Sequence, residues 1–162
     1  MHGARQGRRH LSRAGAAHED LSGHRVGCDA SCIAGEEGPV LILVDSSGWI
    51  EYLADRPLAR RFATYLEGRE PLLVSAIEVY EVYKVIRRDI SEERALAAVA
   101  AMRRAIIAPT DESLALEAAD ISLVHGLALA DSVVYATARR HRAKLVTADA
   151  DFEELPEAVV IR

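Results

Sequence analysis

The amino-acid sequence predicts an α/β fold in which helices cover both faces of an open, mostly parallel sheet of four to five strands. Two observations support this prediction. Short apolar segments alternate with longer segments of helical character, which is typical of chains built from strand–helix–strand units. The apolar segments are unbroken rather than alternating, as expected of strands that helices bury on both faces.

The predicted strands are short runs of β-branched and aliphatic residues, at 40–44, 71–74, 106–108, 144–147 and 158–161. The first ends at Asp45-Ser46-Ser47-Gly48, and Pro109 closes the third. The predicted helices lie between the strands, at 49–66, 75–88, 91–104, 111–125 and 129–141. Pro57 is expected to break the first of them, while Ser91 and Gly126 are expected to begin and end others.

Residues 1–39 differ in composition from the rest of the chain. They hold seven of the ten glycines, four of the six histidines, both cysteines and no aromatic residue. With few large apolar residues, they are predicted to be a disordered N-terminal extension. No apolar core follows the arginines, which argues against a signal peptide, and the acids argue against a transit peptide. Cys28 and Cys32 could bind zinc with nearby histidines, or remain reduced thiols in the cytoplasm.

The charge balance excludes binding of nucleic acid by bulk charge alone. The chain has 20 basic and 25 acidic residues, a net charge of −5, and all of the imbalance falls in residues 40–162, the predicted folded domain. No apolar run approaches the roughly 18 residues of a membrane span, so no membrane association is expected. Action on nucleic acid would require something that offsets the acids locally.

Five acids lie near the ends of the predicted strands or in the first turn of a neighbouring helix, as Glu78 and Asp131 do. In open parallel sheets the binding site lies beyond the carboxyl ends of the strands, so these acids are expected to meet. They are Asp45, Glu78, Asp131, Asp149 and Asp151.

Carboxylates that crowd together raise one another's pKa and destabilise the fold unless a cation balances them. Mg²⁺ and Mn²⁺ prefer oxygen ligands and bind carboxylates together with phosphates. If a bound cation neutralised Asp45, Glu78, Asp131 and Asp149, the net charge of residues 40–162 would change from −5 to −1. The sequence therefore predicts a divalent-cation site that acts on a phosphodiester.

Each acid also has a structural alternative. Asp45 is a favourable N-cap, Asp131 could interact with a helix dipole, and Asp149 and Asp151 could shape a turn. Ser75-x-x-Glu78 is a capping-box pattern, which taken alone is the preferred interpretation of Glu78.

Four segments in this order resemble the successive motifs of PIN-domain ribonucleases, and most closely the VapC toxins of toxin–antitoxin pairs. They are residues 44–50 (VDSSGWI), 75–79 (SAIEV), 127–138 (LALADSVVYATA) and 145–152 (LVTADADF). The resemblance implies a PIN-like three-layer α/β/α sandwich and an Mg²⁺- or Mn²⁺-dependent endoribonuclease. It also implies a homodimer that a cognate antitoxin silences.

Carried over by position, the resemblance implies that Asp45 and Asp131 are the chief metal ligands. Glu78 would complete the ligand set or orient the attacking water, and Asp149 would hold a second ion or a bound water. Water would attack the RNA phosphorus in line and leave a 5′-phosphate product. The groups expected to orient these carboxylates are Ser46, Thr147 and Asp151.

The densest basic cluster is Arg139, Arg140, Arg142 and Lys144. It could hold the RNA backbone, or it could be a solvated helix end where cations meet the dipole. Two other functions remain open at this point. One is a non-catalytic PIN-like module that only binds a partner. The other is a receiver or phosphatase, whose expected additional acids the sequence lacks.

Overall fold

The computed structural model describes residues 40–162. The predicted extension of residues 1–39, with the alternative zinc site at Cys28 and Cys32, lies outside the described residues.

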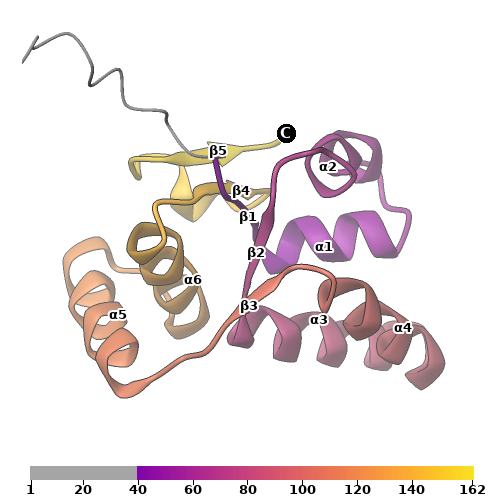
Figure 1. Ribbon diagram of the computed structural model, residues 1–162, viewed down its shortest axis with the longest axis horizontal. Coiled ribbons are helices and arrows are strands. Elements are labelled where there is room, and N and C mark those ends of the chain that lie inside the picture. Colours follow the sequence, from indigo (N-terminus) through magenta and orange to yellow (C-terminus); the bar gives the residue numbers. More distant parts are fainter. Residues whose placement is uncertain (1–39) are drawn as a thin grey trace, which may run out of the picture. The chain divides into compact units, whose positions relative to one another are not determined.

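Five strands form one sheet in the order β3-β2-β1-β4-β5, and every neighbouring pair is parallel (Figure 1). Their bounds are β1 (Ile42–Val44), β2 (Leu72–Ser75), β3 (Ile106–Ala108), β4 (Lys144–Thr147) and β5 (Ala158–Val160). In the register of the central strands, Leu43 of β1 lies beside Leu73 of β2 and Leu145 of β4. The predicted sheet is therefore confirmed, and it is parallel throughout.

The helices are α1 (Ser46–Leu53), α2 (Ala59–Leu66), α3 (Ala76–Asp89), α4 (Glu92–Met102), α5 (Glu112–His125) and α6 (Leu129–Arg140), with a short 3₁₀ helix η1 (Ala150–Phe152). The predicted break near Pro57 is confirmed, because Pro57 lies between α1 and α2. α1 begins at Ser46, three residues earlier than predicted, because Asp45 is its N-cap and accepts a hydrogen bond from the Ser47 N–H.

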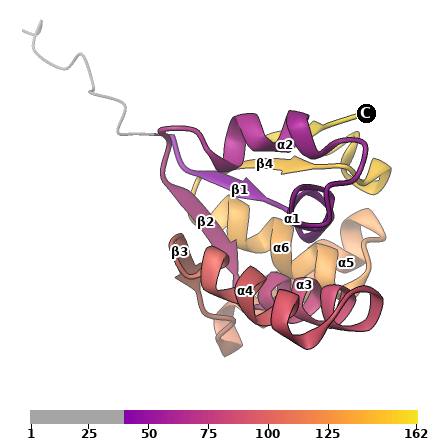
Figure 2. The same cartoon turned by 90° about the vertical axis from the view of Figure 1, so that its right-hand side faces the viewer.

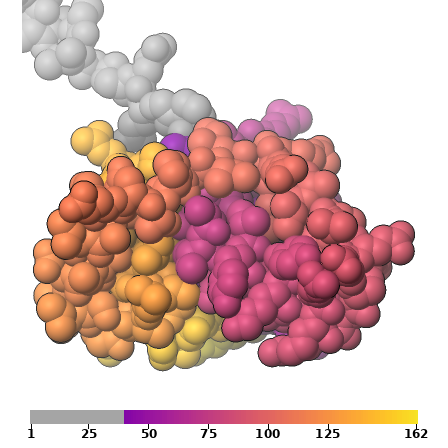
Figure 3. All heavy atoms as spheres, turned by 90° about the horizontal axis from the view of Figure 1, so that it is seen from below, coloured from indigo at the N-terminus to yellow at the C-terminus, as the bar shows by residue number. Residues whose placement is uncertain are grey.

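The side chains of the central strands alternate between two cores. Leu43, Leu73 and Leu145 face the core shared with α5 and α6. Val44, Val74 and Val146 face the opposite core, which α1 to α4 complete. Figures 1 and 2 show these helices on the two sides of the sheet, and Figure 3 shows α3, in magenta, reaching the surface between α4 and the α5–α6 pair. Residues 40–162 thus form a three-layer α/β/α sandwich.

Among residues 40–162, no single helix is long and apolar enough to cross a membrane; α5 and α6 pass that test only as a pair bent by 112°.

The strand order creates a crevice between β1 and β4. From β1 the chain moves outward to β2 and β3 on one side, and later returns to β4 and β5 on the other. Connections that diverge in this way leave a gap at the carboxyl ends of the two central strands, where ligands bind in open parallel sheets. Asp45 follows β1 and Asp149 follows shortly after β4, so both lie at this crevice.

Candidate active site

A cleft of about 410 Å³ opens at the carboxyl ends of β1 and β4. Hollows of about 480 and 540 Å³ occur elsewhere, so size does not distinguish it. Its acids do. Six acidic residues line it, and Glu51 and Asp89 are already engaged, by the Leu58 N–H and by Arg88. The other four come from four different parts of the fold. They are Asp45 after β1, Glu81 on α3, Asp131 on α6 and Asp149 after β4.

Asp45 is almost fully buried, and two hydroxyl groups fix its carboxylate. Ser47 Oγ donates to Asp45 Oδ2 at 2.7 Å, and Thr147 Oγ1 donates to the same oxygen at 2.9 Å. Each hydroxyl group also accepts a hydrogen bond from the backbone just after β4. The Ala148 N–H donates to Ser47 Oγ, and the Asp149 N–H donates to Thr147 Oγ1. Oδ2 is therefore occupied by the protein, and none of these hydrogen bonds uses Oδ1.

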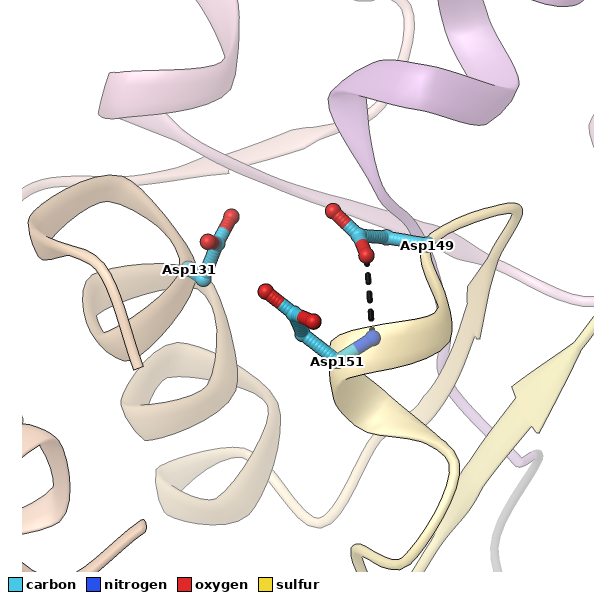
Figure 4. A group of neighbouring side chains, drawn as sticks. All are labelled: Asp131, Asp149 and Asp151. Carbon is cyan, nitrogen blue, oxygen red and sulfur yellow. Dashed lines mark hydrogen bonds between the residues drawn. The ribbon is translucent and has the colours of Figure 1, made fainter. Parts of the chain in front are cut away.

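Asp131, Asp149 and Asp151 present carboxylate oxygens to one another (Figure 4). One oxygen from each lies within 4.8 Å of the other two, which is close enough for a shared cation. Asp149 Oδ1 accepts a hydrogen bond from the Asp151 N–H at 2.9 Å, so this carboxylate also caps η1. The turn interpretation of Asp149 and its position at the cleft are both correct.

The carboxylates disturb one another's titration. Burial raises the pKa of Asp131 from 3.8 to about 6, and the negative charges of Asp45 and Asp149 add to the shift. Burial and the charge of Asp45 also raise the pKa of Glu81, while a hydrogen bond with the Ser46 side chain lowers it. Such mutual repulsion is the condition that a divalent cation relieves.

Glu78 is not among the residues that line the cleft. Its side chain is fully buried, and Oε2 accepts a hydrogen bond from the Ser75 N–H at 2.5 Å, one half of a capping box at the start of α3. Oε1 has no hydrogen-bond partner among residues 40–162. Burial and the charge of Asp45 raise the pKa of Glu78 well above its usual range, which favours the neutral acid.

A sequence model of the PIN domain matches residues 42–158, which is most of the chain and includes all of these acids. The chain belongs to the PIN-domain family. A search of curated proteins gives no significant match.

Solved structures agree with this assignment. A toxin–antitoxin complex from Klebsiella pneumoniae has a TM-score of 0.62 at 26% identity, and the alignment covers 74% of this chain and 96% of that chain. VapC20 of Mycobacterium tuberculosis, described as a sarcin-ricin loop cleaving toxin, has a TM-score of 0.63 at 21% identity over 75% and 98% of the two chains. A DNA-bound VapBC from Salmonella typhimurium has a TM-score of 0.60 at 19% identity over 75% and 97%. The fold is that of a VapC-type PIN domain.

Of the predicted acids of this PIN domain, the structure brings Asp45, Asp131 and Asp149 to one cleft, with Asp151 beside Asp131 and Asp149. The residue that sequence reasoning missed is Glu81. Glu81 lies one helical turn after Glu78, and the signal for it was this spacing. Once Glu78 is assigned to the capping box, the next acid on α3 is free to face the cleft.

The hydroxyl groups that contact the acids differ in part from the predicted ones. Thr147 contacts Asp45, but the serine that does so is Ser47. Ser46 instead lines the cleft and interacts with Glu81.

The predicted basic cluster lies at the opposite end of these elements. Arg139 and Arg140 occupy the last turn of α6, whereas Asp131 occupies its first turn. Arg140 is bound to Glu117 and Asp111 of the α5 region. Lys144 begins β4, while the cleft lies beyond its other end, and its ammonium group contacts the Tyr65 ring.

Proposed function

We propose that this PIN domain is an Mg²⁺- or Mn²⁺-dependent endoribonuclease and the toxin of a toxin–antitoxin pair. The observation that supports it best is the gathering of Asp45, Glu81, Asp131 and Asp149 at the strand-end crevice of this fold. A set of carboxylate oxygens without histidine or thiolate suits a hard cation such as Mg²⁺ or Mn²⁺. The fully buried Glu78 is less suited to that set than Glu81.

In the proposed site, Asp45, Asp131 and Asp149 hold the cation and Glu81 takes the part first expected of Glu78. When bound, the cation supplies Lewis acidity at the phosphate and lowers the pKa of water. Thr147 and Ser47 keep Asp45 in one orientation through its Oδ2. Glu81, whose pKa is raised, is placed to accept the proton of the attacking water.

The proposed partners are an RNA substrate, a cognate antitoxin and a second copy of this chain, all in the cytoplasm. Support comes from the relatives, since several similar solved structures are toxin–antitoxin complexes by their descriptions. The RNA substrate is proposed from the reaction that the carboxylate set can support.

The test of this function is RNA cleavage by the purified protein with Mg²⁺ or Mn²⁺, compared with EDTA. We expect cleavage only with the cation. We expect Asp131→Asn to lower the rate by roughly three orders of magnitude, because loss of charge stabilisation worth several kcal/mol costs about that much. Cleavage that survives complete chelation, or full activity in Asp131→Asn, would refute the proposal. RNA binding without any cleavage would favour a non-catalytic module.

A matched pair of variants tests whether Glu81 or Glu78 takes part in the reaction. Glu81→Gln should abolish cleavage and leave the fold intact, because the side chain lies in the cleft wall. Glu78→Gln should cleave RNA at close to the normal rate, because the amide oxygen can still accept from the Ser75 N–H. The reverse result would return the role to Glu78.

A further inference from the structure

Two arginines line the otherwise acidic cleft. Arg56 lies between α1 and α2, and Arg88 lies in the last turn of α3. Among residues 40–162 they are the only basic side chains in the cleft wall. Both side chains are accessible, with exposed fractions of 42% and 67%.

Asp89 holds the two arginines together. Its Oδ1 lies 2.6 Å from Arg88 Nε, and its Oδ2 accepts from Arg88 Nη2 at 3.1 Å. The same Oδ2 lies 3.7 Å from Arg56 Nη2. One carboxylate is thus shared by two guanidinium groups, so these three side chains together carry a charge of +1. The Glu51 carboxylate, which also lines the cleft, is engaged by the Leu58 N–H.

The backbone that carries each arginine is well fixed. The Arg56 N–H donates to the Glu51 carbonyl at 2.9 Å, and the Leu58 N–H donates to the Glu51 carboxylate at 2.9 Å. Arg88 belongs to the 14-residue helix α3, on the face that also presents Glu81 and Val85 to the cleft. The backbone of Arg88 is therefore held in a helix, and that of Arg56 is held by hydrogen bonds within the loop between α1 and α2.

The spacing of Glu81 and Arg88 along α3 gives the approximate distance between the arginines and the carboxylates. Glu81 and Arg88 are seven residues apart, which corresponds to about 10.5 Å of helix. A stacked strand advances about 3.4 Å per nucleotide, so this distance spans roughly three nucleotides. An RNA strand with one phosphate at the carboxylates would bring another phosphate of the same strand to Arg56 and Arg88.

We propose that Arg56 and Arg88, held together by Asp89, clamp a backbone phosphate of the RNA a few nucleotides from the bond that is cut. The clamp rests on the proposed nuclease function and specifies how an acidic cleft retains an anionic substrate. Asp89 engages Nε and Nη2 of Arg88, so the donors left for a phosphate are Nη1 of Arg88 and the guanidinium group of Arg56. An arginine N–H fork matches two phosphate oxygens. Contacts of this kind position the strand without reading its sequence.

The test measures binding of a labelled single-stranded RNA of mixed sequence by fluorescence anisotropy. Ca²⁺ replaces Mg²⁺, and gel analysis checks that the RNA stays intact. We expect Arg56→Ala and Arg88→Ala each to weaken binding by roughly 3- to 10-fold, and the double variant by more. For single strands, each lost phosphate contact should reduce the slope of log affinity against log salt by about 0.7. With Mg²⁺, the KM for cleavage should rise while kcat changes little, as for a lost uniform contact.

Arg103→Ala is the matched control, because it removes one exposed positive charge outside the cleft. Arg139→Ala tests the basic cluster at the far end of α6 in the same assay. Both are expected to bind RNA nearly as the unchanged protein does. Arg56→Gln and Arg88→Gln, which keep much of the side-chain length, replace the alanine variants if those fail to fold.

The clamp is overturned if the double variant keeps normal affinity and salt slope, or if Arg103→Ala weakens binding as much as either cleft variant. If the unchanged protein cleaves RNA but the double variant is indistinguishable from it, the clamp alone is wrong. If the unchanged protein neither binds nor cleaves RNA, the proposed function fails and the clamp fails with it.

Discussion

Thr147, the last residue of β4, connects two acids of the site through a single hydroxyl group. The group is fully buried, donates to Asp45 Oδ2 and accepts from the Asp149 N–H, both at 2.9 Å. Because β1 and β4 are adjacent, this one side chain fixes the carboxylate at the end of one strand and the backbone at the end of the other. Its contribution to catalysis would therefore be made through the orientation of the acids.

Thr147→Val removes the hydroxyl group with little change in volume. We expect a loss of about 1 to 3 kcal/mol in the free energy of unfolding, because the buried Asp45 carboxylate loses a donor and the partly buried Asp149 N–H loses its acceptor. We expect RNA cleavage to fall by roughly 10- to 100-fold, as for other groups that orient metal ligands. Thr147→Ser, which keeps the hydroxyl, should restore most of the activity. If Thr147→Val cleaves RNA normally, the orienting role is wrong.

Asp131 illustrates how a carboxylate of the proposed site can destabilise the fold that carries it. Its pKa is about 6 in the folded protein and 3.8 ordinarily. The folded state therefore holds the proton more tightly than the unfolded state. Between about pH 4 and 6 the free energy of unfolding must fall as pH rises, and above pH 6 the loss is complete. The full shift corresponds to about 3 kcal/mol, which partial exposure to solvent reduces to about 1.

In EDTA at pH 8, Asp131→Asn is accordingly expected to unfold about 2 to 4 °C above the unchanged protein. Toward pH 4 most of the difference between the two midpoints should disappear, because the carboxyl group is then protonated in the folded state and about half protonated in the unfolded state. Mg²⁺ should raise the midpoint of the unchanged protein at pH 8 and have less effect on the variant. The exposed Asp120→Asn is the control substitution. Equal midpoints for Asp131→Asn and the unchanged protein at pH 8 would contradict the repulsion.

At the scale of helices and strands, the sequence predicts where each element lies better than how it is rotated. The strands are found because unbroken runs such as 40–44 and 144–147 have no helical period. The rotation of α3 is not predicted, and Glu81 rather than Glu78 lines the cleft. Both acids fit one side of a helix three residues apart, and only the packing of α3 on the sheet decides which is buried.

Gly48 permits the close packing that sets the position of α1. A Cβ atom there would lie 2.5 Å from Phe62 Cε1 on α2 and 2.6 Å from Val44 Cγ1 on β1. Gly48→Ala is thus expected to cost about 1 to 3 kcal/mol of stability through overpacking. It should also lower RNA cleavage, because α1 begins with the residues that contact Asp45 and Glu81.

Gly126→Ala provides the comparison for this prediction. Gly126 ends α5 with a φ of +72°, and a Cβ atom there would meet nothing within 4 Å. The substitution should cost about 1 kcal/mol through backbone strain alone. We expect it to leave the rate of RNA cleavage unchanged. A Gly48→Ala protein that is destabilised but fully active would show that the site does not depend on the exact position of α1.

At the scale of the whole molecule, the active edge follows from strand order. Asp45, Asp131 and Asp149 are far apart in the sequence, and the expectation that they converge came from the rule for parallel sheets rather than from any local pattern. The same rule could not place Arg56, which is carried by a loop, or show that Asp89 holds it near Arg88. Those contacts depend on side-chain positions that the sequence does not specify.

Everything that defines this fold lies within residues 40–162, including all eight aromatic residues and the full match to the PIN domain. A chain that begins at Val40 is therefore expected to fold on its own. Its unfolding midpoint should lie within about 2 °C of that of the full chain, a difference of less than about 1 kcal/mol for a domain of this size. RNA cleavage should also be unchanged. A clear loss of either would give residues 1–39 a structural role.

A chain that begins at Asp45 is the sharpest control for this truncation, because it removes only five further residues but takes away β1. That strand pairs with β2 on one side and β4 on the other, and Leu43 and Val44 belong to the two opposite cores. Its loss would split the sheet at the crevice and leave β4 without the neighbour that holds Asp45 against Thr147. We expect no cooperative unfolding transition and no RNA cleavage. A folded, active chain without β1 would contradict the central place of this strand in both the fold and the site.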